Sequence, residues 1–148
     1  MTYEIDQSIK IENTNKASYV SLANSHIYTV SILAREKQIL KRYFRRLGKP
    51  LIFKIFCFAC LCAECLSKQK VDSVYIDKEY LGYEREIKSF IVQVMKIKNK
   101  PETDITFKQV GKKSPSHVAV NIARKKRLAN SKISSQQILK LYEKINKK

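Results

Sequence analysis

The first third of the chain alternates apolar and polar residues in the way that β-strands do. In residues 3–12 the apolar side chains fall on one face, and the polar ones, including Asp6, fall on the other. Residues 18–23 and 26–34 have the same strand-like character, and Asn24 and Ser25 between them suit a tight reversal. The pattern predicts three consecutive strands in an antiparallel meander.

A basic segment and an apolar segment follow these strands. Residues 35–49 are rich in Lys and Arg with interspersed Leu, Tyr and Phe, so this segment either extends the third strand or begins a helix. Gly48 and Pro50 end it, and proline suits the first turn of the next helix. Residues 51–66 are apolar nearly all round, which predicts a well-covered helix packed against the sheet.

The second half of the chain predicts alternating strands and helices. Residues 71–77 form a short run rich in β-branched residues that ends on Asp77, and residues 105–110 predict a fifth strand. Gly82 interrupts the pattern between them, and residues 83–98 then place apolar side chains at helical spacing. A strand that delivers a carboxylate just before a helix is a common place for a site in α/β proteins, although Asp77 equally suits a turn or a helix cap.

The last segments predict two more helices. Ser114 and Pro115 suit the cap and the first turn of one helix, and Ser134 suits the cap of the other. The apolar stripe predicted for the first of them consists of Val118, Ile122 and Ala119.

The element order is therefore βββαβαβα with an extra C-terminal helix. This order predicts a single α/β domain over residues 1–148 with a mixed five-stranded sheet. Its core is expected over residues 3–127, and residues 128–148 are expected to add a basic C-terminal helix.

Composition bounds the class of protein and its partners. A chain of 148 residues is long enough for one domain with one real core. Its 44% hydrophobic and 29% charged residues are typical of a soluble globular protein rather than a disordered one. The formal charge is +17, from 30 Lys and Arg against 13 Asp and Glu. Such an excess costs self-repulsion unless an anionic partner relieves it, so nucleic acid is the first expected partner and an acidic membrane surface the second.

The chain shows no pattern typical of export or of membrane insertion. The N-terminal residues MTYEIDQS are acidic and polar, unlike those of a signal peptide. The longest apolar run, residues 51–66, is too short to span a bilayer comfortably and contains Lys54 and Glu64. We therefore expect an intracellular, cytoplasmic protein without a membrane partner.

All four cysteines lie in this apolar run, as Cys57, Cys60, Cys62 and Cys65. The spacing C-x2-C-x-C-x2-C suggests a metal knuckle, but at about 100° per residue on a helix the four thiols point in scattered directions. Zinc and iron–sulfur sites also require tight turns, whereas the neighbours here are Phe, Leu and Ala. We interpret the cysteines as reduced, small core residues, with a regulatory disulfide as the alternative.

Three short stretches carry a resemblance to a known group of enzymes. They are EIDQS in the first predicted strand, YIDKEY at the end of the fourth, and VGKKSPSH before the helix that begins near Ser114. Together with the element order, they make the chain similar to the ribonuclease H-like superfamily, which includes ribonucleases H, junction resolvases, and transposase and integrase catalytic domains. VGKKSPSH is also similar to late segments of uncharacterised members found in mobile elements. The resemblance covers residues 3–127 and implies a ribonuclease H-like fold.

The resemblance also implies a metal site. Strands one and four are neighbours in that superfamily, which would bring Asp6 and Asp77 side by side. Two carboxylates without a charge partner repel one another, and a bridging divalent cation removes that conflict. Mg²⁺ and Mn²⁺ prefer oxygen ligands of this kind. The resemblance therefore implies a Mg²⁺ or Mn²⁺ site anchored on Asp6 and Asp77, and two-metal hydrolysis of phosphodiester bonds.

The remaining expected ligands depart from the pattern of the superfamily. Its members usually carry a Glu on the first helix, and the acid in residues 51–66 is Glu64, near the end of that segment, so Glu79 is the alternative. They also carry an acid or a His on the helix after the fifth strand, where this chain has His117. His117 is a candidate for metal binding or proton transfer, or is a plain polar surface residue.

Two basic clusters are candidates for contacts with phosphate groups. One flanks the predicted helix near Ser114, and the other lies beside Tyr43 and Phe44, whose rings suit stacking on bases. Basic residues at the end of a helix also offset its dipole, so part of the first cluster has a structural interpretation. The candidates are Lys112, Lys113, Ser114, Arg124, Lys125, Lys126 and Arg127 in the first cluster, and Arg42, Arg45 and Arg46 in the second. No segment predicts base-specific recognition, so we expect backbone-dominated binding that depends steeply on salt.

These observations lead to three hypotheses. The first is a metal-dependent nuclease or phosphodiester-transfer enzyme that acts on DNA or RNA with little sequence specificity. The second is a non-catalytic nucleic-acid-binding protein on the same fold. The third is a basic scaffold or toxin-like protein that binds ribosomal RNA or an anionic membrane. The oligomeric state is left open, with a homodimer as one option because two-site chemistry on DNA often uses dimers.

Overall fold

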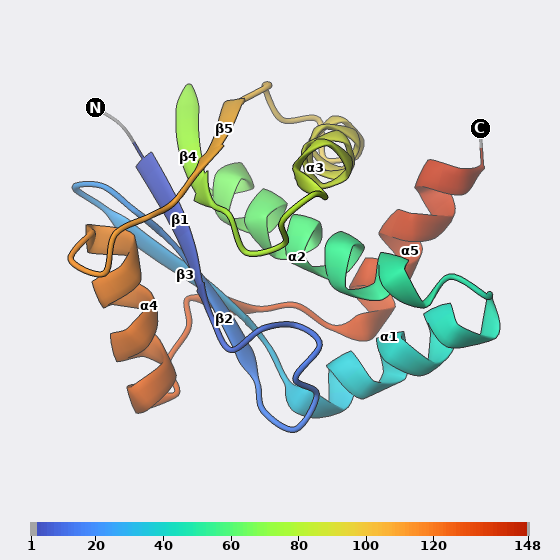
Figure 1. The fold of residues 1–148 in the computed structure, drawn as a ribbon. Coiled ribbons are helices and arrows are strands. Elements are labelled where there is room, and N and C mark those ends of the chain that lie inside the picture. Colours follow the sequence, from blue (N-terminus) through green and yellow to red (C-terminus); the bar gives the residue numbers. More distant parts are fainter. Residues whose placement is uncertain (1–2, 148) are drawn as a thin grey trace.

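Three N-terminal strands form the antiparallel half of a mixed sheet, as the sequence predicts (Figure 1). The computed structural model describes residues 3–147. In it, β1 (Tyr3–Ser8) pairs with β2 (Ser18–Ala23), and β2 pairs with β3 (Ile27–Ile32), both antiparallel. Short polar connections join the three strands, which is why sequential neighbours are also spatial neighbours.

The other three strands join the sheet in parallel. β4 (Ser73–Asp77) pairs with β1, β5 (Asp104–Lys108) pairs with β4, and β6 (Ser131–Lys132) pairs with β3. The strand order is β5-β4-β1-β2-β3-β6. The prediction of a mixed sheet in an α/β fold is confirmed. The predicted number of five strands is wrong, because a two-residue strand such as β6 is too short to show an alternation.

β1 is shorter than the pattern of residues 3–12 predicts. It ends at Ser8, because Ile9 adopts a left-handed conformation with φ of 68°, which extended backbone cannot accommodate. The Ser18 hydroxyl donates to the Ile9 carbonyl at 2.7 Å and holds this bend. Ile11 still returns to the core with no exposed area, so the alternation of apolar residues continues past the end of the strand.

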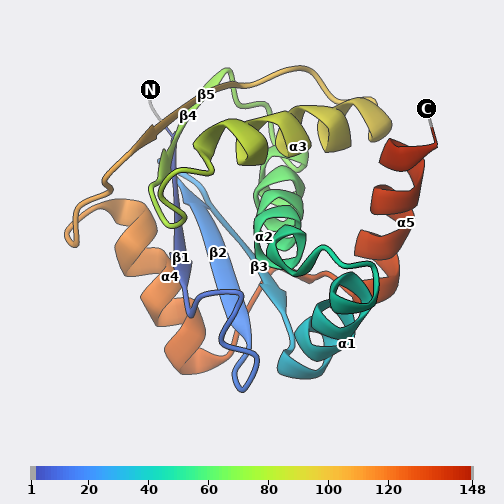
Figure 2. The ribbon, with the colours of Figure 1, turned by 45° about the vertical axis from the view of Figure 1, so that its right-hand side comes forward.

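Four helices cover one face of the sheet and one helix covers the other within the described residues (Figures 1 and 2). The four are α1 (Ala34–Arg46), α2 (Pro50–Ser67), α3 (Glu84–Ile97) and α5 (Ser135–Asn146), and the one on the opposite face is α4 (Pro115–Lys126). α1 resolves the ambiguity of residues 35–49 in favour of a helix, so two helices rather than one separate β3 from β4.

The main core lies between the sheet and α2. Ile5 of β1 and Ile76 of β4 have no exposed area and pack in the same cluster as the side chains of α2. Among the described residues, α2 is the one helix long and apolar enough to cross a membrane, yet 67% of it is buried inside the fold. The prediction of a buried core helix is therefore confirmed, and its apolar composition is explained by the sheet and helices that cover it.

The four cysteines on α2 are free and fully buried, which agrees with their interpretation as small core residues. Burial raises the pKa of the Cys57 thiol to about 12, and it raises the pKa values of the other three thiols as well. Neutral thiols in an apolar layer neither bind a metal ion nor attack a disulfide readily.

The C-terminal helix belongs to the main core rather than lying outside a core of residues 3–127. Ile138 has no exposed area and Tyr142 is 5% exposed, and both pack in the main cluster. The ring of Tyr142 meets Phe44 of α1 and Phe56 of α2 edge-on, at centroid distances of 4.9 and 5.1 Å. α5 therefore joins α1 and α2 into one layer.

α4 faces the sheet with smaller side chains than the sequence predicts. Val118 and Ile122, two residues of the predicted stripe, are 46% and 48% exposed. Ala119, the third residue of the predicted stripe, is buried, and Ser116, Val120 and Ala123 are buried with it. Their spacing of three and four residues defines one helix face, and small side chains allow the helix to approach β1 and β2 closely. The contact of His117 with β1, described below, fixes the rotation of the helix.

Candidate metal centre

β1 and β4 bring two aspartates together on the face of the sheet where α4 lies. Ile5 and Ile76 are partners in the parallel register of these strands, and both point into the main core. Because successive residues of a strand point to opposite faces, Asp6 and Asp77 project to the other side. The structure thus contains the juxtaposition of Asp6 and Asp77 that the ribonuclease H-like resemblance implies.

Glu79 joins the two aspartates from the loop after β4. The Glu79 N–H donates to the Asp77 carbonyl at 2.9 Å, and this tight turn folds the chain back toward β1. One carboxylate oxygen from each of Asp6, Asp77 and Glu79 lies within 4.8 Å of the other two. Three oxygen donors this close together form a set that a hard divalent cation is able to bind.

Asp6 is held from two sides. It is 3% exposed, its Oδ1 accepts from the Gln7 N–H at 2.8 Å, and its Oδ2 lies 2.7 Å from Nδ1 of His117. Burial raises the pKa of Asp6, and the hydrogen bonds of His117 and Gln7 oppose that effect, while the charge of Asp77 adds to it. Asp6 is therefore fixed in position, and its carboxylate gains from any nearby positive charge.

Burial and two acidic neighbours favour the protonated form of Glu79. Burial, together with the hydrogen bond and charge of Asp77 and the charge of Asp6, raises the pKa of Glu79 to about 9. Without a cation, Glu79 therefore holds a proton at neutral pH. Binding of a cation by deprotonated Glu79 would relieve the same repulsion.

The neighbouring strand and the loop after β4 hold the other two carboxylates in place. Asp77 Oδ1 accepts from the Val110 N–H at 2.7 Å, which ties β4 to the segment that leads into α4. The Tyr80 hydroxyl, next to Glu79, accepts from the Ile11 N–H at 3.1 Å and lies 3.3 Å from Gln7 Oε1. Tyr80 is therefore a positioning residue that binds the loop of Glu79 to the end of β1.

His117 lies in the site, as the sequence allows. Ser114 caps α4 by accepting from the His117 N–H at 3.3 Å, and Pro115 occupies the first turn. This start places the imidazole against Asp6 with about a third of the side chain exposed. Because Nδ1 faces Asp6, Nε2 is the nitrogen left for a proton or a metal ion.

Glu64 does not belong to the site, so its prediction as a catalytic residue is wrong. It projects from α2, on the opposite side of the sheet from α4 (Figure 2). Its Oε1 accepts from Lys98 Nζ at 2.9 Å, and this ion pair joins α2 to the end of α3. The helix position near the end of α2 therefore serves packing, and Glu79 is the third carboxylate instead.

The two predicted basic clusters lie on different sides of the molecule. Lys112 and Lys113 are exposed just before α4, and Arg124, Lys125, Lys126 and Arg127 lie at its other end. Arg42, Arg45 and Arg46 lie on α1, in the layer on the opposite face of the sheet (Figure 1). The carboxylates share a face with the α4 cluster and not with the α1 cluster.

The edge of the sheet beside the carboxylates is open. α4 packs on β1, β2 and β3, which leaves the same face of β4 and β5 accessible. Asp77 is the register partner of Lys108, which is exposed and has its Nζ 3.9 Å from the centroid of the Tyr75 ring. The Lys108 ammonium group therefore lies on the strand next to Asp77, at the accessible edge of the sheet.

Sequence reasoning missed Tyr80, Lys108 and Glu4 as neighbours of the site. Glu4 projects to the same face as Asp6, two residues earlier, and its Oε2 is buried without a hydrogen-bond partner among the described residues. The period-two alternation of β1 and β4 was the available signal for Glu4. Tyr80 and Lys108 depend on contacts across the sheet, which no local pattern indicates.

No protein-family model, curated protein or solved structure matches this chain. The function is therefore argued from the geometry of the site and the charge around it.

Proposed function

We propose that this protein is a divalent-metal-dependent nuclease or phosphodiester-transfer enzyme that acts on nucleic acid with little sequence specificity. The observation that carries the proposal is the convergence of Asp6, Asp77 and Glu79 within 4.8 Å in a chain with a formal charge of +17. Three converging carboxylates are suited to binding a cation. The excess positive charge of the rest of the molecule is suited to a polyanionic partner.

The fold supports this proposal through the arrangement of its strands. β1 and β4 are parallel neighbours, and the carboxylates follow from the same relation of strands one and four that the ribonuclease H-like resemblance implies. We include a ribonuclease H-like relationship in the proposal on this ground. The sixth strand and the position of Glu79 in place of a helix-borne Glu are features of this chain.

The residues present fit a Mg²⁺ or Mn²⁺ ion. The donors are carboxylate oxygens, which these hard cations prefer, and the pKa of Glu79 is raised by burial and by the neighbouring carboxylates, whose negative charge a bound cation would offset. Asp6 and Asp77 would hold the metal, with Glu79 as the third ligand. When bound, the metal would activate a water molecule and stabilise the leaving oxygen of a phosphodiester.

The protein's own residues supply positioning and proton transfer in this mechanism. Hydrogen bonds from Gln7 and Val110 fix the carboxylates of Asp6 and Asp77 before any ligand binds. His117 is oriented by Asp6 and moves a proton at Nε2, either from the attacking water or to the leaving group. Lys108 and the basic residues around α4 attract the phosphate backbone.

The test is cleavage of a labelled panel of DNA, RNA, hybrid and branched substrates with Mg²⁺, Mn²⁺ or EDTA. We expect metal-dependent cutting by the parent and a loss of at least about a hundredfold in Asp77→Asn, because one metal anchor becomes a neutral amide. Asp104→Asn is the matched control, since Asp104 is an exposed carboxylate on the adjacent strand and its loss changes the charge equally.

A second function, non-catalytic nucleic-acid binding on the same fold, is favoured by one observation. Glu64 is paired with Lys98 away from the site, so the third carboxylate comes from the loop after β4 and not from the helix that the resemblance implies. Tight binding in EDTA without cutting by the parent under any metal condition would support this function and exclude the enzyme.

A further inference from the structure

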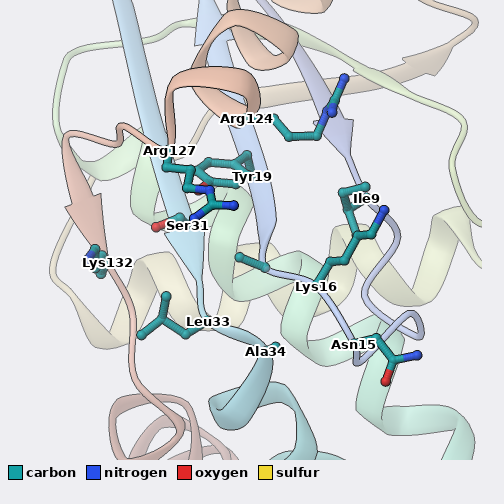
Figure 3. Close-up of a pocket in the computed structure, with 11 residues that line it drawn as sticks. Ile9, Asn15, Lys16, Tyr19, Ser31, Leu33, Ala34, Arg124, Arg127 and Lys132 are labelled. Atoms are coloured by element: carbon teal, nitrogen blue, oxygen red, sulfur yellow. The ribbon is translucent and has the colours of Figure 1, made fainter.

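A groove of about 600 Å³ lies at the C-terminal end of α4, beyond the carboxylates. Figure 3 shows the side chains around it: Arg124 comes from α4, Arg127 from the C-cap of that helix, Lys16 from the loop between β1 and β2, and Lys132 from β6. The loop after β1 and the region of α4 and β6, which are far apart in the sequence, therefore both contribute to its walls. Lys16 and Lys132 were not predicted to take part in binding.

The charge of the groove is one-sided. Of the eleven residues that line it, four are basic and none is acidic. Four cations around one depression repel each other, and in water that repulsion is relieved by anions. A single small anion meets only part of this set, whereas a chain of phosphates reaches all of it. The groove is therefore suited to a polyanion.

The loop wall of the groove is held in place by buried contacts. Lys37 has no exposed area, and its Nζ donates to the Asn13 carbonyl at 2.6 Å and to Ser18 Oγ at 2.8 Å. Gln38 Nε2 donates to the Thr14 carbonyl at 2.9 Å. These contacts anchor the residues immediately before Lys16, so the groove exists before a ligand binds and little ordering is required on binding.

The groove lies in line with the carboxylate site. Ile9, which lines the groove, is three residues beyond Asp6 and just past the end of β1, and Arg124 is seven residues beyond His117 on α4. Both separations correspond to about 10 Å. Along the axis of a duplex each strand advances about 3.4 Å per phosphate, so this separation corresponds to about three nucleotides of a duplex strand.

We propose that this groove binds the phosphodiester backbone of a nucleic acid about three nucleotides from the position that the carboxylates act on. The inference rests on the proposed function for the identity of the partner. Tyr19 is only 7% exposed in the groove wall, so its ring does not provide a platform for base stacking. Recognition is therefore by phosphate charge and is independent of base sequence.

The test measures binding in EDTA, where no cleavage occurs, with fluorescently labelled duplex and single-stranded oligonucleotides. The groove variant combines Lys16→Gln, Arg124→Gln and Arg127→Gln. The control variant combines Arg42→Gln, Arg45→Gln and Arg46→Gln, which removes the same charge from the opposite layer. We expect the groove variant to lose about ten- to a hundredfold in affinity and the control to lose less than about threefold. The slope of log K against log salt should fall by about two to three in the groove variant alone.

A smaller variant guards against damage to α4. Lys16→Gln with Lys132→Gln leaves the helix unchanged and should still lower affinity and salt slope, with an unaltered melting temperature. Equal losses of oligonucleotide affinity in the groove and control variants, or no loss in the groove variant, would overturn the proposal that the groove binds nucleic acid. The proposal would also be overturned if the parent bound vesicles of anionic lipid but not oligonucleotides, and if the groove variant lost that vesicle binding.

The outcomes also separate this inference from the proposed function. If the parent cuts nucleic acid, the groove variant should raise KM by about the loss in affinity and retain kcat, because it leaves the carboxylates intact. If the parent binds nucleic acid through the groove but never cuts it, the groove proposal is supported and the proposed nuclease function is contradicted. If the parent cuts nucleic acid and the groove variant behaves like the control, the nuclease function is supported and the groove proposal is contradicted.

Discussion

Ile76 and Asp77 are neighbours on β4 but lie in opposite environments. Ile76 has no exposed area and packs under α2, whereas Asp77 lies on the other face with Asp6 and Glu79. The same contrast holds for Ile5 and Asp6 on β1. One face of the sheet is closed by four helices, and the other is covered by α4 alone and stays open over β4 and β5.

This contrast links the core to the site. Because side chains alternate with a period of two, a slip of β4 by one residue against β1 would turn Asp77 toward α2 and Ile76 to the open face. Burying a charged group and exposing a large apolar one is costly, so the packing of the closed face enforces the register that assembles the carboxylates. Each prediction below changes one side of this relation.

The largest change in stability is expected from a substitution on the closed face. Ile76→Ala removes three buried carbon atoms and leaves a cavity under α2, so the free energy of unfolding should fall by about 3 kcal/mol. Denaturant unfolding measures this value. Val92→Ala, on a half-buried position of α3, is the comparison and should cost less. A loss below about 1 kcal/mol in Ile76→Ala would show that the closed face does not enforce the register.

On the open face, we expect a substitution of intermediate size in its effect, and this substitution should raise the free energy of unfolding instead of lowering it. The pKa of Glu79 is about 9 in the folded state, above its ordinary value of 4.5. Between these values the unfolded chain releases a proton that the folded chain keeps, so stability of the metal-free protein falls as pH rises from about 4.5 to 9. Glu79→Gln removes this term. In EDTA it should be more stable than the parent at pH 7 by roughly 1–2 kcal/mol, because solvent screening of this half-buried group reduces the roughly 3 kcal/mol that the full shift in pKa implies.

Thermal unfolding at several pH values measures this difference. The two proteins should converge below pH 4.5, the ordinary pKa of the group, where Glu79 becomes protonated in both states of the parent, and diverge toward neutral pH. Glu102→Gln, at an exposed loop position, is the control for the loss of one acid. A Glu79→Gln variant that is less stable than the parent at pH 7 would mean that the carboxylates are not in mutual repulsion.

Much of the closed and open faces could be predicted from the sequence. Alternation along residues 3–12 and the β-branched run of residues 71–77 placed Asp6 and Asp77 on strands, and the resemblance implied that those strands lie side by side. The nearly uniform apolar character of α2 identified it as a core helix. These features depend on local periodicity and on element order, which a single sequence carries.

The errors share one physical cause. Val118 and Ile122 were expected to face the sheet because they are large and apolar, but the cap at Ser114 and the contact of His117 with Asp6 set the rotation of α4. Glu64 was assigned to the site from its helix, and the partner that holds it, Lys98, is distant in sequence. Contacts between distant segments decide such positions, and they leave no mark on local pattern.

The smallest change in stability is expected at Tyr80, which joins the loop after β4 to the end of β1. Its hydroxyl accepts from the Ile11 N–H and lies 3.3 Å from Gln7 Oε1, so Tyr80→Phe leaves a buried N–H without its partner. The free energy of unfolding should fall by about 1 kcal/mol. Because the loop of Glu79 is then less firmly held, the rise in melting temperature on adding Mg²⁺ should also be smaller than in the parent. Tyr43→Phe, which removes one hydroxyl from a half-buried ring of α1, is the control. If Tyr80→Phe lowers stability but keeps the full response to Mg²⁺, Tyr80 supports the fold alone and Glu79 is positioned by its own turn to Asp77.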